Sequence, residues 1–157
     1  MIEVESIFGT SIKKHQYVTY QKEDDKVIVY ERGELIYIFN FHPNNSYTDY
    51  LIGTHWRSDH MILIETDEER FGGHQRLNDG HNKWMKVDEK GWAERRHSLK
   101  VYIPSRCAII LAPFEFAHKY PEVKMPDYNK EDPHFKQFIT SPSKEVSTKT
   151  QAAPSQS

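Results

Sequence analysis

The feature that most constrains this chain is a series of short apolar runs separated by turns. The runs are rich in Val, Ile, Tyr and Phe, the residues that favour β-strands. Turn-forming Gly, Pro, Asp and Asn stand between them, and no helical period of comparable length competes. We therefore predict an all-β fold, an antiparallel Greek-key β-sandwich. The predicted strands are residues 16–21, 26–32, 35–41, 47–54, 61–66, 97–103 and 107–112.

Two of the predicted strands are apolar on both faces. In LIYIFNF, Ile36 and Ile38 alternate with apolar side chains of the other face, and in CAIILA the same is true of Ala108 and Ile110. A strand in a two-sheet sandwich is normally apolar on its inner face only. Both faces of these strands therefore need cover, either from the C-terminal extension of this chain or from a second domain docked on the sheet.

The composition of the chain changes along its length. Residues 1–16 are weakly patterned, and residues 17–112 carry the strand pattern. Residues 113–139 scatter aromatic side chains among prolines, so we expect an irregular extension along the domain surface. Residues 140–157 contain no aromatic side chain. Such a segment cannot bury enough apolar surface to offset its ordering entropy, and we predict a disordered tail.

Charge and cysteine content narrow the classes of partner. The formal net charge is −2 at pH 7, which provides no basic field for nucleic acid. We find no apolar stretch long enough for a membrane span and no signal peptide. The one cysteine, Cys107, excludes a disulfide within the chain. We therefore expect a cytoplasmic protein that binds neither nucleic acid nor membrane.

The usual signatures of catalysis and metal binding are weak. Cys107 lies in an apolar run, where a thiol packs in the core and is inert. The acidic run Glu65, Asp67, Glu68 and Glu69 is interpreted as a solvated face rather than a catalytic pair. The histidines fall in separate loops without zinc-ligand spacing, and Gly72-Gly73 predicts a tight bend, not a phosphate loop. We expect no catalytic residue, metal site or cofactor.

Aromatic side chains leave sugar binding open. Trp56, Trp84 and Trp92 all lie in or beside predicted loops or strand ends. Aromatic faces stack on the apolar faces of pyranose rings, so these tryptophans are candidate sugar contacts. Exposed aromatics in β domains also cover sheet edges and partner surfaces. The pattern alone does not separate the two interpretations.

Several segments together resemble a known domain. DDKVIVYERGELIYIFNFHPNNSYTDYLIGT, ERFGGHQRL and HSLKVYIPSRCAIIL resemble, in order and spacing, the C-terminal β domain of the 1,4-alpha-glucan (glycogen) branching enzymes of the alpha-amylase superfamily. The resemblance covers roughly residues 5–112. IFGTS is similar to the stretch that links the catalytic barrel to this domain, so residues 1–16 are interpreted as a linker remnant. The chain departs from the family pattern in its two long loops, around residues 78–81 and 95–98.

The resemblance implies a role without chemistry of its own. In branching enzymes the catalytic carboxylates stand on a (β/α)8 barrel that precedes this domain, and this chain contains no such barrel. The family likeness favours packing against that barrel, with Ile36, Ile38, Ala108 and Ile110 as candidate docking residues. It also implies contact with glycogen or another alpha-glucan. The alternative is a free-standing carbohydrate-binding β module without catalytic activity.

Overall fold

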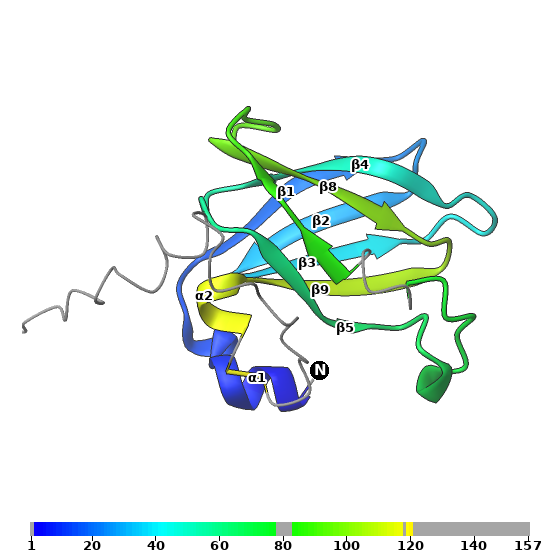
Figure 1. The fold of residues 1–157 in the computed structure, drawn as a ribbon, viewed down its shortest axis with the longest axis horizontal. Helices are drawn as coiled ribbons and strands as arrows, with labels where there is room; N and C mark the ends of the chain where they lie inside the picture. The colour runs from blue at the N-terminus through cyan, green and yellow to red at the C-terminus, as the bar shows by residue number, and fades with distance from the viewer. Residues whose placement is uncertain (1, 78–82, 118, 121–157) are drawn as a thin grey trace, which may run out of the picture. The chain divides into compact units, whose positions relative to one another are not determined.

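The computed structural model of the protein describes residues 2–77, 83–117, 119 and 120. Within them the predicted β-sandwich is confirmed, because the strands form two antiparallel sheets (Figure 1). The larger sheet has the strand order β1-β2-β3-β9-β5-β6, and the smaller sheet has the order β4-β8-β7. The strands are β1 (Gln16–Lys22), β2 (Val27–Arg32), β3 (Leu35–Asn40), β4 (Tyr47–Thr54), β5 (His60–Glu65), β6 (Trp84–Met85), β7 (Val87–Asp88), β8 (His97–Ile103) and β9 (Cys107–Pro113).

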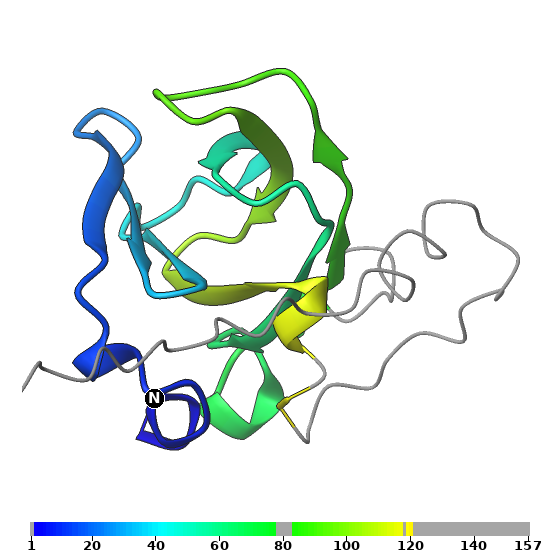
Figure 2. The same ribbon diagram turned by 90° about the vertical axis from the view of Figure 1, so that its left-hand side faces the viewer.

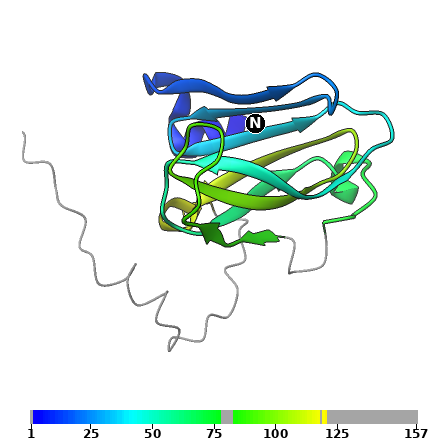
Figure 3. The same ribbon diagram turned by 90° about the horizontal axis from the view of Figure 1, so that it is seen from above.

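Strands β1, β2 and β3 form consecutive hairpins and lie side by side (Figure 3). The turn between β2 and β3 is tight, with Arg32 paired to Leu35 across it. Gly33 supplies the positive φ of 61° that this turn requires. The chain then crosses to the smaller sheet with β4 and returns in β5, while β9 enters between β3 and β5. Among the described strands, the pairings β3–β9, β4–β8 and β5–β9 therefore join segments distant in sequence.

An apolar core fills the space between the two sheets. Its members alternate along each strand with residues of the opposite face, as the period of a β-strand requires. Ile36 and Ile38 on β3 belong to it and are 1% and 0% exposed. Fully burying one such side chain contributes about 2 kcal/mol of transfer free energy. The buried members are Val27, Val29, Ile36, Ile38, Ile52, Ile62, Leu77, Met85, Leu99, Val101, Ile103, Cys107, Ile109 and Leu111.

A second apolar cluster lies on the outer face of the larger sheet. Two short helices, α1 (Ile2–Phe8) and α2 (Phe114–Ala117), pack on this face (Figure 1, Figure 2). Val4 and Phe8, one helical turn apart, bury against the sheet and are 1% and 6% exposed. Part of the cover expected over the two-faced strands therefore comes from segments of this chain. The buried members are Val4, Phe8, Leu35, Tyr37, Met61, Leu63, Ile110, Ala112, Ala117 and Tyr120.

The structure describes several of the predicted segments only in part. Within the segment expected to be a linker, α1 is followed by a 3-10 turn at Thr10–Ile12. Of the predicted extension, 113–139, the structure describes residues 113–117, 119 and 120. The predicted disordered tail, 140–157, lies outside the described residues. In the described part of the chain, no helix has the length and apolar character needed to cross a membrane.

Candidate functional site

Two of the segments that carry the family resemblance meet through a buried carboxylate, Asp67. Asp67 follows β5 and accepts hydrogen bonds from the backbone N–H groups of Arg76 and His74, at 2.7 and 3.2 Å. The Arg76 guanidinium binds both carboxylate oxygens at 2.7 to 3.1 Å and donates to Ser105 Oγ at 3.1 Å. Burial acts to raise the pKa of Asp67, but these hydrogen bonds hold that pKa below its usual value. GGHQRL is thereby tied to the PSR turn after β8.

The bend predicted at the paired glycines is confirmed. Gly72 has a φ of 78°, and a Cβ on Gly73 would lie 2.0 Å from the carbonyl oxygen of Asp67. The prediction of a solvated acidic face is wrong for Glu65 and Asp67, which are 1% and 3% exposed. Glu65 ends β5 on the buried side, and its carboxylate accepts the N–H of Asp67 at 2.6 Å. Burial raises the pKa of Glu65.

The loop after β3 is fixed by Asn40, which is 2% exposed. Its side-chain amide donates to the carbonyl oxygens of Asn45 at 2.9 Å and Pro104 at 3.0 Å, and its Oδ1 accepts the N–H of His42 at 2.9 Å. Buried polar side chains are generally spent in this way on backbone groups of irregular segments. The motifs of the resemblance therefore build the loops at this end of the sandwich.

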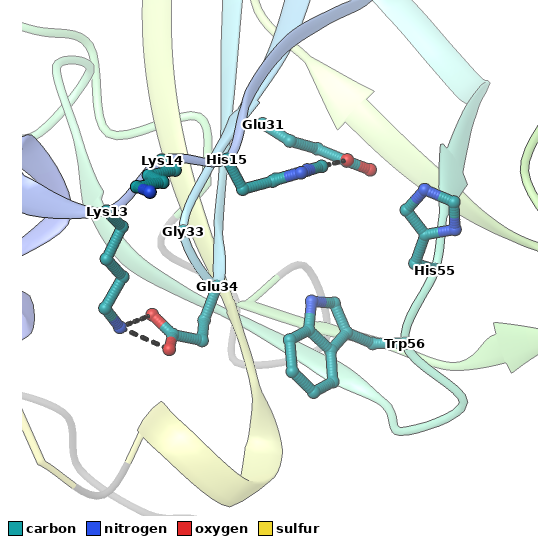
Figure 4. Close-up of a pocket in the computed structure, with 8 residues that line it drawn as sticks. All are labelled: Lys13, Lys14, His15, Glu31, Gly33, Glu34, His55 and Trp56. Carbon is teal, nitrogen blue, oxygen red and sulfur yellow. Dashed lines mark hydrogen bonds and ion pairs between the residues drawn. The ribbon is translucent and has the colours of Figure 1, made fainter.

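A surface hollow of about 420 Å³ lies elsewhere, beside the turn between β2 and β3. Its walls come from the segment before β1, from the β2–β3 turn and from the residues after β4 (Figure 4). Because these three segments are distant in sequence, only the folded sheet brings them together. The lining residues are Lys13, Lys14, His15, Glu31, Gly33, Glu34, His55 and Trp56.

Glu31 organises the upper wall of the hollow. Its side chain is 6% exposed, and one carboxylate oxygen lies 3.0 Å from His15 Nε2. Arg95, itself 7% exposed, donates from Nε to the other oxygen at 3.1 Å. The Arg95 guanidinium also lies over the ring of Tyr17, 4.4 Å from its centroid, in a cation–π contact. A buried carboxylate held by a guanidinium is a rigid, preorganised acceptor.

Trp56 and His55 form the facing wall (Figure 4). The backbone N–H of Trp56 donates to Thr54 Oγ1 at 3.2 Å. The Trp56 ring makes an edge-to-face contact with the ring of Phe116, with centroids 5.1 Å apart. The rings of His55 and His15 meet edge to face at 6.3 Å. Partial desolvation, followed by the positive charge of Arg95, lowers the pKa of His55. His55 is therefore neutral at pH 7 and can both donate and accept a hydrogen bond.

The groups that line the hollow can bond to a ligand. Lys13 and Glu34 form an ion pair at its base, so the charge of each is compensated. Neither Ser nor Cys is among the lining residues, and Glu31 is already committed to Arg95 and His15. An aromatic wall, the imidazoles of His15 and His55 and a few charged groups are a lining that suits a polyhydroxylated ligand.

The other two candidate tryptophans lie outside this hollow. Trp92 is 41% exposed and pairs through its backbone with Arg95. Trp84 is half-buried, donates its indole N–H to Asp59 Oδ2 at 3.2 Å and packs on Phe114 at 5.3 Å. The structure thus places Trp92 near the arginine that supports the hollow and places Trp84 in the outer apolar cluster.

The four predicted docking residues divide between the two faces of the larger sheet. Ile36 and Ile38 point into the core between the sheets and are shielded from any partner. Ile110 lies on the outer face and is 3% exposed, beneath the two helices. Ala108 pairs with Phe39 on the same outer face and is half-buried. An accessible docking surface on this sheet therefore has to lie on the outer face.

Cys107 packs in the inner core, and burial raises the pKa of its thiol. Among the residues that the structure describes, no three His, Cys, Asp or Glu side chains gather to hold a metal ion.

The sequence does not mark His15, Glu31 and Arg95 as a group. Glu31 lies 16 residues from His15 and 64 residues from Arg95. No local motif marks such a set, because its members share a site only through strand pairing. The one available signal was a charged residue, Glu31, at an inward-alternating position of an apolar strand.

This chain is similar in sequence to a family of β domains and to several enzymes that share one name. A family model described as "Alpha amylase, C-terminal all-beta domain" matches residues 17–114. The 1,4-alpha-glucan-branching enzyme of Saccharomyces cerevisiae is 44% identical over 99 residues, which is 63% of this chain and 14% of that protein. The corresponding enzyme of Dictyostelium discoideum is 42% identical over 95 residues, 60% of this chain and 14% of that protein.

A third relative extends the aligned region. The 1,4-alpha-glucan-branching enzyme of Debaryomyces hansenii is 39% identical over 116 residues, which is 71% of this chain and 16% of that protein. The chain therefore matches only about one seventh of the length of these relatives.

Proposed function

We propose, because this chain belongs to the alpha amylase C-terminal all-beta domain family, that it serves as the C-terminal β module of a 1,4-alpha-glucan-branching enzyme. In this role it packs against a catalytic portion and stabilises it. The identity of 44% over 99 residues to the yeast enzyme is the observation that carries the proposal. Alone, the chain is not expected to branch glucan, since the relatives' remaining length has no counterpart in it.

The structure supports a stabilising role rather than a catalytic one. The motifs shared with branching enzymes, around Asp67, Arg76 and Asn40, are occupied in fixing loops. A cysteine content of one, with Cys107 buried, fits the cytoplasmic location that we propose for the protein.

A graft tests this function directly. In the grafted enzyme, this 157-residue chain replaces the matching 99-residue segment of the yeast relative. We expect the grafted enzyme to fold and to branch amylose, followed by the fall in iodine absorbance. The yeast enzyme with the segment deleted is the control and should be insoluble or inactive. A graft no better than the deletion would contradict the proposed function.

The hollow lined by Trp56 favours a second candidate function, glucan contact. Trp56 would supply an apolar platform, while His15, His55 and Glu34 would bond to sugar hydroxyls. Trp92, exposed beside Arg95, is a secondary candidate. The N–H of Trp84 is already engaged by Asp59, so Trp84 is the weakest of the three candidates.

Affinity electrophoresis in a glycogen gel tests this contact. The full chain should be retarded relative to a gel without glycogen, and Trp56→Ala should move closer to the unretarded position. Phe71→Ala is the matched control, because Phe71 is an exposed aromatic residue, 52% accessible, that does not line the hollow. Unretarded wild-type protein, or equal retardation of the wild type and Trp56→Ala, would remove glucan contact at this hollow.

A further inference from the structure

Four aromatic rings form a continuous stack on the outer face of the larger sheet. Tyr30 on β2 stacks on Tyr37 of β3, with ring centroids 4.7 Å apart and planes 3° from parallel. Tyr30 also stacks on Phe39 at 5.9 Å and 10°, and Phe39 stacks on Phe41 at 5.7 Å and 6°. The stack runs along β3 toward the loop that follows it.

Burial falls steadily along this stack. Tyr37 is 5% exposed within the outer cluster, which α1 and α2 help to cover. Tyr30 and Phe39 are half-buried, and Phe41 is 60% exposed. The two helices thus cover one end of the stack, and none of the described residues buries the other end to the same degree.

Neighbouring strands widen the exposed end. Val18 on edge strand β1 pairs with Tyr30 and is 56% exposed. Ile28 and Ala108 pair with Phe39 from either side, and both are half-buried. Directly paired residues project from the same face of a sheet, so these side chains form one surface. We call it the outer patch: Val18, Ile28, Tyr30, Phe39, Phe41 and Ala108.

The geometry of the outer patch suits a protein partner. The rings of Tyr30, Phe39 and Phe41 lie at nearly parallel planes, with successive centroids 5.9 and 5.7 Å apart. The Tyr30 hydroxyl is the one polar side-chain group of the patch, so the patch offers little to bond sugar hydroxyls, whereas apolar protein side chains pack well on such a surface. A contiguous apolar surface of this kind is characteristic of protein contact sites.

The course of the chain identifies the partner. The matching family is a C-terminal domain, so the unmatched length of the relatives precedes it. In this chain the residues that precede β1 begin with α1, which already packs on the outer face through Val4 and Phe8. A catalytic portion joined ahead of α1 would therefore approach the sheet from the side of the outer patch.

We infer that the outer patch is the surface on which the catalytic portion of a 1,4-alpha-glucan-branching enzyme docks, which rests on the function proposed above. The contact continues the apolar cover that α1 and α2 begin. Of the docking residues predicted from the sequence, Ile36 and Ile38 are buried in the core, whereas the outer patch consists of residues that the fold leaves more accessible.

Thiol labelling at Phe41 tests the inference. Phe41→Cys and the control Phe71→Cys are made both in the isolated 157-residue chain and in the grafted enzyme, and alkylation by iodoacetamide is followed by peptide mass spectrometry. The control residue is 52% exposed and lies outside the patch, and native Cys107 is buried. In the isolated chain both introduced thiols should react at similar rates. In the graft, the alkylation rate of Cys at position 41 should fall by about tenfold or more, whereas the rate at position 71 should not change.

The outcomes separate the inference from the function on which it rests. A graft that branches amylose but leaves position 41 reactive would overturn the docking surface alone. Slow labelling of position 41 already in the isolated chain would also overturn it, because residues 121–157 or a second copy would then be the cover. A graft that fails to fold would refute the proposed function and the docking surface with it.

A stability comparison provides a second readout. Phe41→Ser should change the melting temperature of the isolated chain by no more than Phe71→Ser does, since both residues are largely exposed there. In the grafted enzyme Phe41→Ser should lower the melting temperature and Phe71→Ser should not. Equal effects of the two substitutions in the graft would contradict docking at the outer patch.

Discussion

Replacing Arg76 by Met should destabilise the protein far more than removing an equally close surface ion pair. Arg76 is 28% exposed, and its partner Asp67 is 3% exposed. Methionine keeps an unbranched apolar stem in place of the arginine methylene groups but removes every guanidinium bond. Among the described residues, the backbone N–H groups of Arg76 and His74 would then remain as donors to the buried Asp67 carboxylate.

The magnitude follows from this geometry. Breaking a buried ion pair by removing one partner costs about 3 to 5 kcal/mol, because the other charge is left uncompensated. The two backbone donors and the partial exposure of Arg76 place the expected loss at the low end, about 3 kcal/mol. For a domain of this size that loss corresponds to a fall of about 10 °C in melting temperature.

Urea unfolding at pH 7, followed by tryptophan fluorescence, measures the effect. With an m value of about 2 kcal/mol per M, the midpoint of Arg76→Met should fall by about 1.5 M. Arg57→Met is the matched control, because Arg57 and Glu89 are 2.8 Å apart but both 77% exposed. Its loss should stay below about 0.5 kcal/mol. The pair distances are nearly equal, so the two variants differ in the burial of the pair and in the number of bonds that the arginine makes.

A double variant checks the cause. Arg76→Met combined with Asp67→Asn leaves no unpaired charge, and should be at least as stable as Arg76→Met alone. If Arg76→Met loses no more stability than Arg57→Met, the buried network does not hold the long loop and the reasoning fails.

Three further predictions follow from other buried groups. Burial lowers the pKa of His60 to about 3, so unfolding takes up a proton and stability should fall by about 1.4 kcal/mol per pH unit below about pH 6.5. His60→Gln should remove this contribution from the slope, as measured by urea titrations between pH 7 and 5. Glu31→Gln should cost about 3 kcal/mol in the same assay, because Arg95 stays buried without its counter-charge. Gly73→Ala should cost about 2 kcal/mol or more in thermal melts, because its Cβ would meet the Asp67 carbonyl at 2.0 Å.

The strands were predictable because their signal is local. Alternating and fully apolar runs of β-favouring residues, bounded by Gly, Pro and Asp, placed the longer strands within about two residues of their observed ends. The two-residue strands β6 and β7 are too short to produce a periodic pattern. Helix α1 has one short apolar side, Val4 and Phe8, and depends on the sheet for its stability.

The arrangement of the strands relative to one another could not be predicted from the hydrophobic pattern. The sequence showed that β3 is apolar on both faces, but it did not show which face meets the smaller sheet. A strand has two equivalent sides until its partners are known, so Ile36 and Ile38 could not be told from Tyr37 and Phe39. The hollow at Trp56 depends on three separate segments and was likewise hidden. Asp67 looked solvated because its arginine partner, Arg76, lies nine residues further along the chain and no local pattern links the two.

Calorimetric melting of the grafted enzyme tests the central claim, packing of this module against a catalytic portion, most directly. A module that packs on the catalytic portion shares its unfolding, because binding to the folded state raises the stability of both. We predict a single transition above the melting temperature of the isolated 157-residue chain. Two transitions, one of them at the temperature of the isolated chain, would contradict the claim.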